Sequence, residues 1–145
     1  VQAVHVANAH TDTDAIIYFT KSNVVHTGDV FAGPQYPFID TGSGGSLDGV
    51  IAALATVLAR IDDDTKIIPG HAPLQKKSDL EAFRRMLVTM RERVAREIRA
   101  GKTQEQVVAM NLTKEFDEKS ARPGSFITPT TFVQRAYVDL KRTVR

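Results

Sequence analysis

The amino-acid sequence predicts an α/β protein of the α+β type, in which a short, mostly antiparallel sheet is followed by a helical C-terminal tail. Three short runs of strand-like composition fall within the first 28 residues, a spacing typical of a β-hairpin or meander rather than of βαβ units. From residue 76 onward, apolar residues recur mainly at helical spacing. We therefore expect one partial domain of 145 residues, with strands, a helix and polar loops in 1–75 and the helical tail in 76–145.

The first half of the chain contains the residues that favour strands. β-branched and aromatic side chains are concentrated in four runs, at residues 1–8, 15–19, 24–26 and 65–68. Ser46 precedes a stretch with apolar residues about every 3.6 positions, and this stretch stops at the three aspartates 62–64. A helix is therefore expected between them, and its apolar face consists of Leu47, Val50, Ile51, Leu54, Val57, Leu58 and Ile61.

The second half of the chain shows helix-capping signals. Ser78 and Glu81 fit the S-x-x-E capping box, which predicts a long helix that begins there and ends at Gly101. The apolar stripe of this helix consists of Leu80, Phe83, Leu87, Met90, Val94 and Ile98, with its arginines mostly outside. Two shorter helices are expected after it, and their capping or first residues are Thr103, Gln106, Thr128 and Pro129.

Composition excludes several kinds of site and partner. The chain has no cysteine, which excludes disulfides, thiolate zinc sites, iron–sulfur clusters and cysteine nucleophiles. Its formal net charge is only +2, with 19 Lys and Arg interleaved with 17 Asp and Glu, so we expect neither nucleic acid nor a membrane as a partner. No apolar run approaches the roughly 20 residues that span a bilayer. The G-x-S-x-G motif of serine hydrolases does not occur.

Three polar residues follow expected strands, where side chains from different strands can meet at one edge of a sheet. They are His10, Asp29 and His71. Imidazole nitrogens and a carboxylate oxygen are suitable ligands for zinc, iron or manganese. Each residue alone also fits an ordinary role in a turn or on the surface. The metal-site hypothesis therefore depends on the three occurring together.

The segments that contain these residues form a recognisable pattern. They are His10-Thr11-Asp12-Thr13-Asp14 before an apolar strand, then His26-Thr27-Gly28-Asp29, then Ile67-Ile68-Pro69-Gly70-His71. In this order and spacing they resemble the C-terminal half of the metallo-β-lactamase superfamily, and the resemblance extends more loosely into the helical tail. It implies half of an αβ/βα sandwich, with helices on one face of the sheet and a metal site at one edge of the sandwich.

The resemblance implies a role for each of the three residues. His10 matches the third histidine of the first metal site, Asp29 the carboxylate that bridges two metals, and His71 the last histidine of the second site. The implied activity is that of a dinuclear metallohydrolase, in which metal-bound hydroxide attacks an ester, amide, thioester or phosphoester. The expected divalent metal is zinc, with iron or manganese as alternatives. Asp12, Asp14 and His26 fit turn or strand roles. The alternative is that they hydrogen-bond to the ligands from behind and orient them.

The remaining ligands of the superfamily come from an H-x-H-x-D-H segment, which this sequence lacks. No complete catalytic set is therefore present, and we expect weak or absent metal binding and little catalysis from this chain alone. The chain starts at Val1 in a strand-like alternation, so we expect it to begin within the fold and leave its cellular compartment open. Its expected partners are the missing N-terminal half and, in the complete protein, a small-molecule substrate. The alternative is a non-catalytic half-domain that forms a homodimer as a structural or interaction module.

Overall fold

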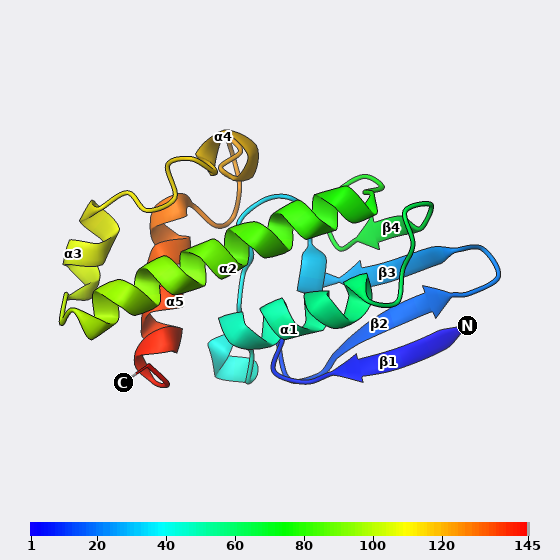
Figure 1. Ribbon diagram of the computed structural model, residues 1–145, viewed down its shortest axis with the longest axis horizontal. Coiled ribbons are helices and arrows are strands. Elements are labelled where there is room, and N and C mark those ends of the chain that lie inside the picture. Colours follow the sequence, from blue (N-terminus) through cyan, green and yellow to red (C-terminus); the bar gives the residue numbers. More distant parts are fainter. Residues whose placement is uncertain (145) are drawn as a thin grey trace.

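In the computed structural model, which describes residues 1–144, one four-stranded sheet forms the N-terminal part of the molecule (Figure 1). Its strands lie side by side in chain order and are β1 (Gln2–Val6), β2 (Asp14–Phe19), β3 (Val24–Gly28) and β4 (Lys66–Pro69). β1, β2 and β3 pair antiparallel, whereas β4 runs parallel to β3. The prediction of a mostly antiparallel sheet is confirmed.

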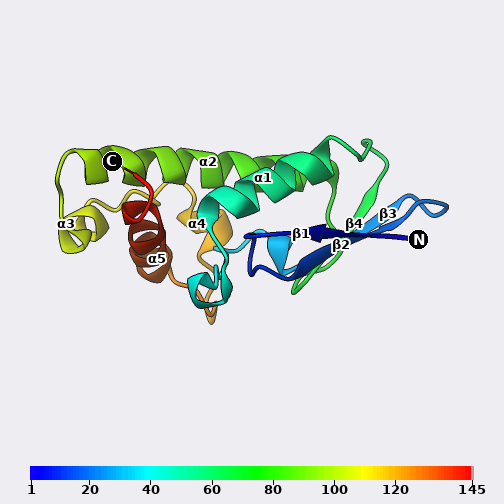
Figure 2. The same ribbon diagram turned by 90° about the horizontal axis from the view of Figure 1, so that it is seen from below.

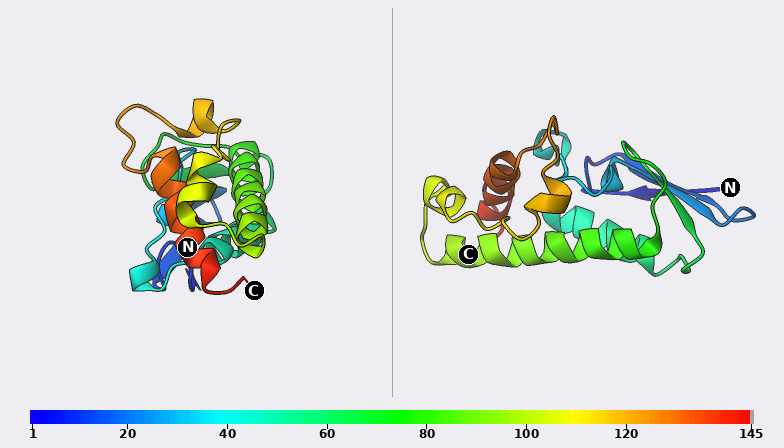
Figure 3. Two further views of the ribbon diagram at one scale, coloured as in Figure 1. Left: turned by 90° about the vertical axis from the view of Figure 1, so that its left-hand side faces the viewer. Right: turned by 90° about the horizontal axis from the view of Figure 1, so that it is seen from above.

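Helices cover one face of this sheet and continue beyond it as the tail. α1 (Leu47–Leu58) and α2 (Lys77–Arg99) lie on the same side of the sheet, as Figure 2 shows. The far part of α2 extends past the sheet to the shorter helices, which are α3 (Gln104–Ala109), α4 (Asp117–Ser120) and α5 (Pro129–Lys141) (Figure 3). The predicted α+β class is therefore confirmed. Among residues 1–144, no helix combines the length and the apolar character needed to cross a membrane.

The two faces of the sheet differ in their surroundings. Ile16, Val25 and Ile67 lie on the face under α1 and α2 and are almost completely buried. The residues between them point the other way, as the two-residue period of a strand requires. On that second face Ile17 is only half-buried and Phe19 is 36% exposed. One part of the core thus lies between the sheet and the helices α1 and α2. The rest lies among α2 and the helices of the tail, where Val94, Phe132 and Leu140 are buried.

The start of α1 is held from two sides. The Ser46 side chain accepts a hydrogen bond from the Gly49 amide at 3.0 Å, which confirms the predicted N-cap. Oδ2 of Asp139, from the distant helix α5, accepts a second bond from the Leu47 amide at 2.8 Å. Burial raises the pKa of Asp139 above its ordinary value. The tail is therefore fastened to the sheet-covering helix through a free backbone donor of that helix.

The start of α2 differs from the prediction. The helix begins at Lys77, and the carboxylate of Asp79 accepts a hydrogen bond from the Lys76 amide at 2.9 Å. The expected capping box of Ser78 and Glu81 is therefore wrong by two residues. The reason lies just before the helix, where Gln75 makes two backbone hydrogen bonds with Ile67 of β4 and so directs the chain into the helix earlier. The predicted end is correct, because Gly101 follows the helix with a positive φ of 76°.

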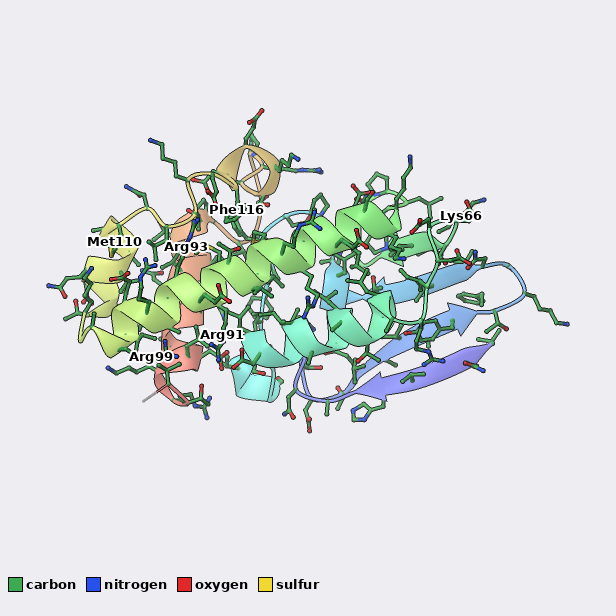
Figure 4. The ribbon with its side chains drawn as sticks, viewed as in Figure 1. Lys66, Arg91, Arg93, Arg99, Met110 and Phe116 are labelled. Carbon is green, nitrogen blue, oxygen red and sulfur yellow. The ribbon has the colours of Figure 1, made fainter. Side chains whose placement is uncertain are left out.

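Arginines on α2 connect neighbouring elements (Figure 4). Arg91 contacts Asp48 of α1 through two hydrogen bonds, the shorter of 2.8 Å. Arg93 donates to the Leu112 carbonyl and to the Glu115 carboxylate, both at 2.7 Å. These arginines lie on the outer side of α2, as expected, and they bind protein carboxylates there.

The tail also contacts the loop that leads from β3 to α1. Tyr36 in this loop is 2% exposed, and its ring stacks on Phe132 of α5 at a centroid distance of 5.0 Å. Its hydroxyl donates to Oδ1 of Asp117 at 2.7 Å. Asp117 is the first residue of the short helix α4, which the sequence analysis did not predict. It holds the loop against the tail, and this loop forms part of the cavity described next.

Candidate functional site

A cavity of about 580 Å³ lies between the edge of the sheet and the tail. His10, Asp29 and His71 all line it, although they are far apart in the sequence. The rest of its wall comes from the loop after β3 and from residues 122–127, which connect α4 to α5. The wall residues outside the three candidates are Ala32, Gln35, Tyr36, Phe38, Arg122, Pro123, Gly124, Ser125, Phe126 and Ile127. The structure thus places the three predicted site residues around one space.

Asp29 and His71 form a direct pair. Nε2 of His71 lies 3.0 Å from Oδ1 of Asp29, with 69% and 39% of the two side chains exposed. Asp29 follows β3 directly, after Gly28 in the left-handed region with φ of 51°. His71 follows β4, and its amide bonds to the Ala32 carbonyl at 2.8 Å. The ends of two neighbouring parallel strands therefore bring the carboxylate and the imidazole together.

Gly70 permits this close approach. A Cβ atom at position 70 would overlap Oδ1 of Asp29 and lie 2.9 Å from the Gly28 carbonyl oxygen. Both distances are shorter than real Cβ contacts allow. The Pro-Gly sequence before His71 therefore provides the space that the Asp29 carboxylate occupies.

His10 lies beside a different carboxylate. Its Nδ1 is 3.5 Å from Oδ1 of Asp14, which is longer than a hydrogen bond, and both side chains are largely buried. The other carboxylate oxygen of Asp14 accepts a bond from the Thr11 amide at 2.8 Å, so Asp14 also closes the turn. The His10 ring packs against Phe38 at a centroid distance of 5.8 Å. The carboxylate lies on the Nδ1 side of the ring, and the opposite nitrogen, Nε2, makes no hydrogen bond within residues 1–144.

The other two supporting candidates lie elsewhere. Asp12 is exposed, and its carboxylate accepts a bond from Asn8 at 3.3 Å. Nδ1 of His26 accepts a bond from the Gly28 amide at 3.0 Å, so it caps the end of its own strand. Asp12 therefore serves its turn and His26 its strand, and neither residue is in the wall of the cavity.

Sequence reasoning did not anticipate the wall that the tail provides. Residues Arg122-Pro123-Gly124-Ser125 form a tight turn, in which the Ser125 amide donates to the Arg122 carbonyl at 3.0 Å. Gly124 has a φ of 77°, so proline and glycine occupy the two central positions that a type II turn favours. The Pro-Gly pair was a signal for this turn. Its position over His10 and Asp29 depends on tertiary packing, which no local pattern contains.

The donor set fits divalent metal ions in part. The Asp29–His71 separation of 3.0 Å is that of a direct hydrogen bond, and it also falls within the range of about 2.9 to 3.4 Å between two ligands of one zinc ion. Within residues 1–144, however, no three His, Cys, Asp or Glu side chains lie close enough to hold an ion by themselves. Asp29 and His71 therefore supply two donors, and His10 supplies a separate one. Further ligands are needed to bind a metal firmly.

Comparisons with known proteins identify the fold. The stereoselective inverting sec-alkylsulfatase Pisa1 from Pseudomonas sp. matches 93% of this chain with a TM-score of 0.76 and 19% identity. A double mutant of that enzyme also matches 93% of this chain, with a TM-score of 0.75 and 18% identity. The metallo-β-lactamase DIM-1 matches 60% of this chain with a TM-score of 0.51 and 16% identity. No protein-family model matches the sequence, and no curated protein does so significantly. The chain therefore has the fold of a part of a metallo-β-lactamase domain.

The extent of each match is informative. This chain spans 23% of the length of the alkylsulfatase and 41% of the length of the lactamase. A match over 93% of the chain must include most of the helical tail, whereas the lactamase leaves two fifths of the chain unmatched. The arrangement of tail and sheet therefore also occurs in the solved structure of an alkylsulfatase.

Proposed function

We propose that this chain is the C-terminal part of a metal-dependent hydrolase of the metallo-β-lactamase superfamily, acting on an ester, amide, thioester or phosphoester. The observation that carries this proposal is the cavity that His10, Asp29 and His71 line together from three separate loops. The fold, shared with a sulfatase and a lactamase, supports a hydrolytic activity for the complete protein.

Each residue has a stated task in this proposal. Asp29 and His71 would hold one divalent ion, and Asp29 and His10 would contribute to holding a second. Asp14, beside Nδ1 of His10, favours the ring orientation that directs Nε2 away from it. The divalent ions, most simply zinc, would supply an activated water and neutralise the charge that develops on the substrate. Because this chain provides only three ligands, it is inactive without the half that carries the others.

The first test of this proposal is the gene itself. The codons upstream of Val1 should encode an H-x-H-x-D-H segment in the preceding half-domain. If they do not, the proposal that an upstream half completes the site is wrong.

The second test uses the protein completed by that segment. Asp29→Ala should lower hydrolysis of its best ester, thioester or phosphoester substrate by about two orders of magnitude or more, because both ions lose a ligand. Asp12→Ala is the matched control, since Asp12 is also an aspartate of a strand-end loop but lies outside the cavity wall. Activity that survives Asp29→Ala, or that falls equally in Asp12→Ala, would exclude the assigned role.

A second candidate function has its own observation. The sheet face opposite the helices has no covering layer within residues 1–144. Its apolar side chains are Ala3, Ala15, Ile17, Phe19, Val24 and Ile68, and they lie beside His5, His26 and Lys66. Two copies of this chain could bury these faces against each other as a homodimer without catalytic activity. Light scattering after size-exclusion chromatography tests this, with a dimer expected at tens of micromolar and a monomer expected for Ile17→Lys. A monomeric wild-type chain would refute it.

A further inference from the structure

The tail contributes a charged side chain to the cavity. Arg122 is exposed at the cavity wall, and its guanidinium forms no ion pair or hydrogen bond with any part of residues 1–144. The acidic side chain of the wall is Asp29, and it is already paired with His71. If Asp29 also holds cations, as proposed above, it is even less available to an arginine. The guanidinium of Arg122 is therefore solvated and available to an anionic group that enters the cavity.

The same turn also contributes an apolar side chain. Phe126 is 83% exposed, which is unusual for a phenylalanine, and it lies edge-on to Phe38 at a centroid distance of 5.8 Å. Phe38 in turn contacts the His10 ring. The Arg135 guanidinium also lies over the Phe38 ring, 4.4 Å from its centroid. An aromatic wall with this cation beside it therefore extends from His10 to the rim of the cavity. Because this wall begins at a candidate ligand, it suits the part of a substrate next to the reacting group.

The local sequence fixes the positions of both side chains. The type II turn at residues 122–125 has Arg122 as its first residue, and Phe126 follows its last. Proline fixes the backbone at the second position, and glycine accepts the positive φ at the third. The turn thus presents the guanidinium and the phenyl ring together at one side of the cavity.

From this arrangement we infer that Arg122 determines specificity, and that it selects substrates that carry an anionic group beside an apolar moiety. This inference rests on the proposed function, because it takes the cavity to be the substrate site. A guanidinium binds a carboxylate, sulfate or phosphate group through charge-assisted hydrogen bonds, whereas an uncharged isostere gains little from it. Phe126 and Phe38 add affinity for the apolar part whatever its charge.

The test is a pair of matched small ligands, 4-ethylbenzoate and 4-ethylbenzamide, titrated into the 145-residue chain and followed by amide chemical shifts. A chelator is present, so no metal ion contributes to the binding of the carboxylate. The wild-type chain should bind the benzoate about three- to tenfold more tightly than the benzamide, a modest factor because Arg122 is exposed. The shifts should be centred on residues 122–127 and on His10.

Four variants separate the two contributions. Arg122→Gln should abolish the preference, and Arg122→Lys should retain a part of it. Arg99→Gln, at the far end of α2 (Figure 4), should leave the preference unchanged. Phe126→Ala should weaken both ligands by the same factor. Equal wild-type affinity for the two ligands, or a preference that survives Arg122→Gln, would overturn the inference. Metal titration of the same samples tests the proposed function separately, since the charge preference is measured without metal.

Discussion

Replacement of Gly70 by alanine tests the geometry of the candidate site most sharply. A Cβ atom there overlaps the Asp29 carboxylate and lies 2.9 Å from the Gly28 carbonyl oxygen. The backbone of Gly70 is not in the left-handed region, so the cost arises from contact and not from conformational strain. Overpacking of this kind costs about 1–3 kcal/mol. For a chain of this size we expect a loss of about 4–12 °C in the melting temperature.

A double-mutant cycle identifies the source of that cost. Asp29→Ala alone should lower the free energy of unfolding by less than about 1 kcal/mol, because the Asp29–His71 pair is exposed. In the Asp29→Ala background, Gly70→Ala should cost at least about 1 kcal/mol less than in the wild type, because one of the two overlapping groups is gone.

Urea unfolding of the four proteins measures these differences. Gly42→Ala at an exposed site provides the control, since its added Cβ would come no closer than 3.3 Å to its nearest neighbour, Oδ1 of Asp40. Additive effects of the two substitutions would refute the placement of Asp29 against Gly70.

Two further predictions concern the tail. Tyr36→Phe should lower the free energy of unfolding by about 1–2 kcal/mol in urea, because the buried hydroxyl donates to the Asp117 carboxylate; an unchanged value would show that α4 is not held through this bond. Hydrogen bonds from Lys102 at 2.6 Å and Arg96 at 2.8 Å lower the pKa of Glu97 below its ordinary value of 4.5. The ionised Glu97 carboxylate therefore stabilises the fold above pH 4.5, and this stabilisation is lost as the pH falls through the lowered pKa. Thermal melts from pH 7 to pH 3 should therefore fall less steeply for Glu97→Gln than for the wild type, and parallel curves would contradict this.

Local patterns predict the parts of the fold that local chemistry determines. The strands, the Ser46 cap, the Gly101 stop and the Thr103–Gln106 capping box are all present, because each depends on residues within a few positions of one another. The start of α2 was misplaced because Asp79 and Glu81 are both acceptable caps, and the choice depends on the pairing of Gln75 with Ile67. The helix α4 was missed because four residues are too few for an apolar period.

The candidate site also has a part that local sequence patterns predict and a part that depends on tertiary packing. His10, Asp29 and His71 could be singled out because each is a ligand-type residue in a loop that follows a strand, and they line one cavity. Their role as metal ligands stays a prediction. Arg122 and Phe126 were not found, because their place in the cavity wall follows from the packing of the tail, through contacts such as the one between Tyr36 and Asp117. The Asp139 bond to the Leu47 amide, which joins residues 92 positions apart, is equally invisible to local reasoning.

Zinc binding at equilibrium tests the central claim most directly. The chain, freed of metal and dialysed against buffered zinc, should bind zinc weakly, and the bound amount should fall at least about tenfold in Asp29→Ala and in His71→Ala but not in Asp12→Ala. Elemental analysis gives the zinc content per chain as the free concentration is raised. Zinc binding that is the same in all four proteins would contradict the claim that these side chains form part of a metal centre.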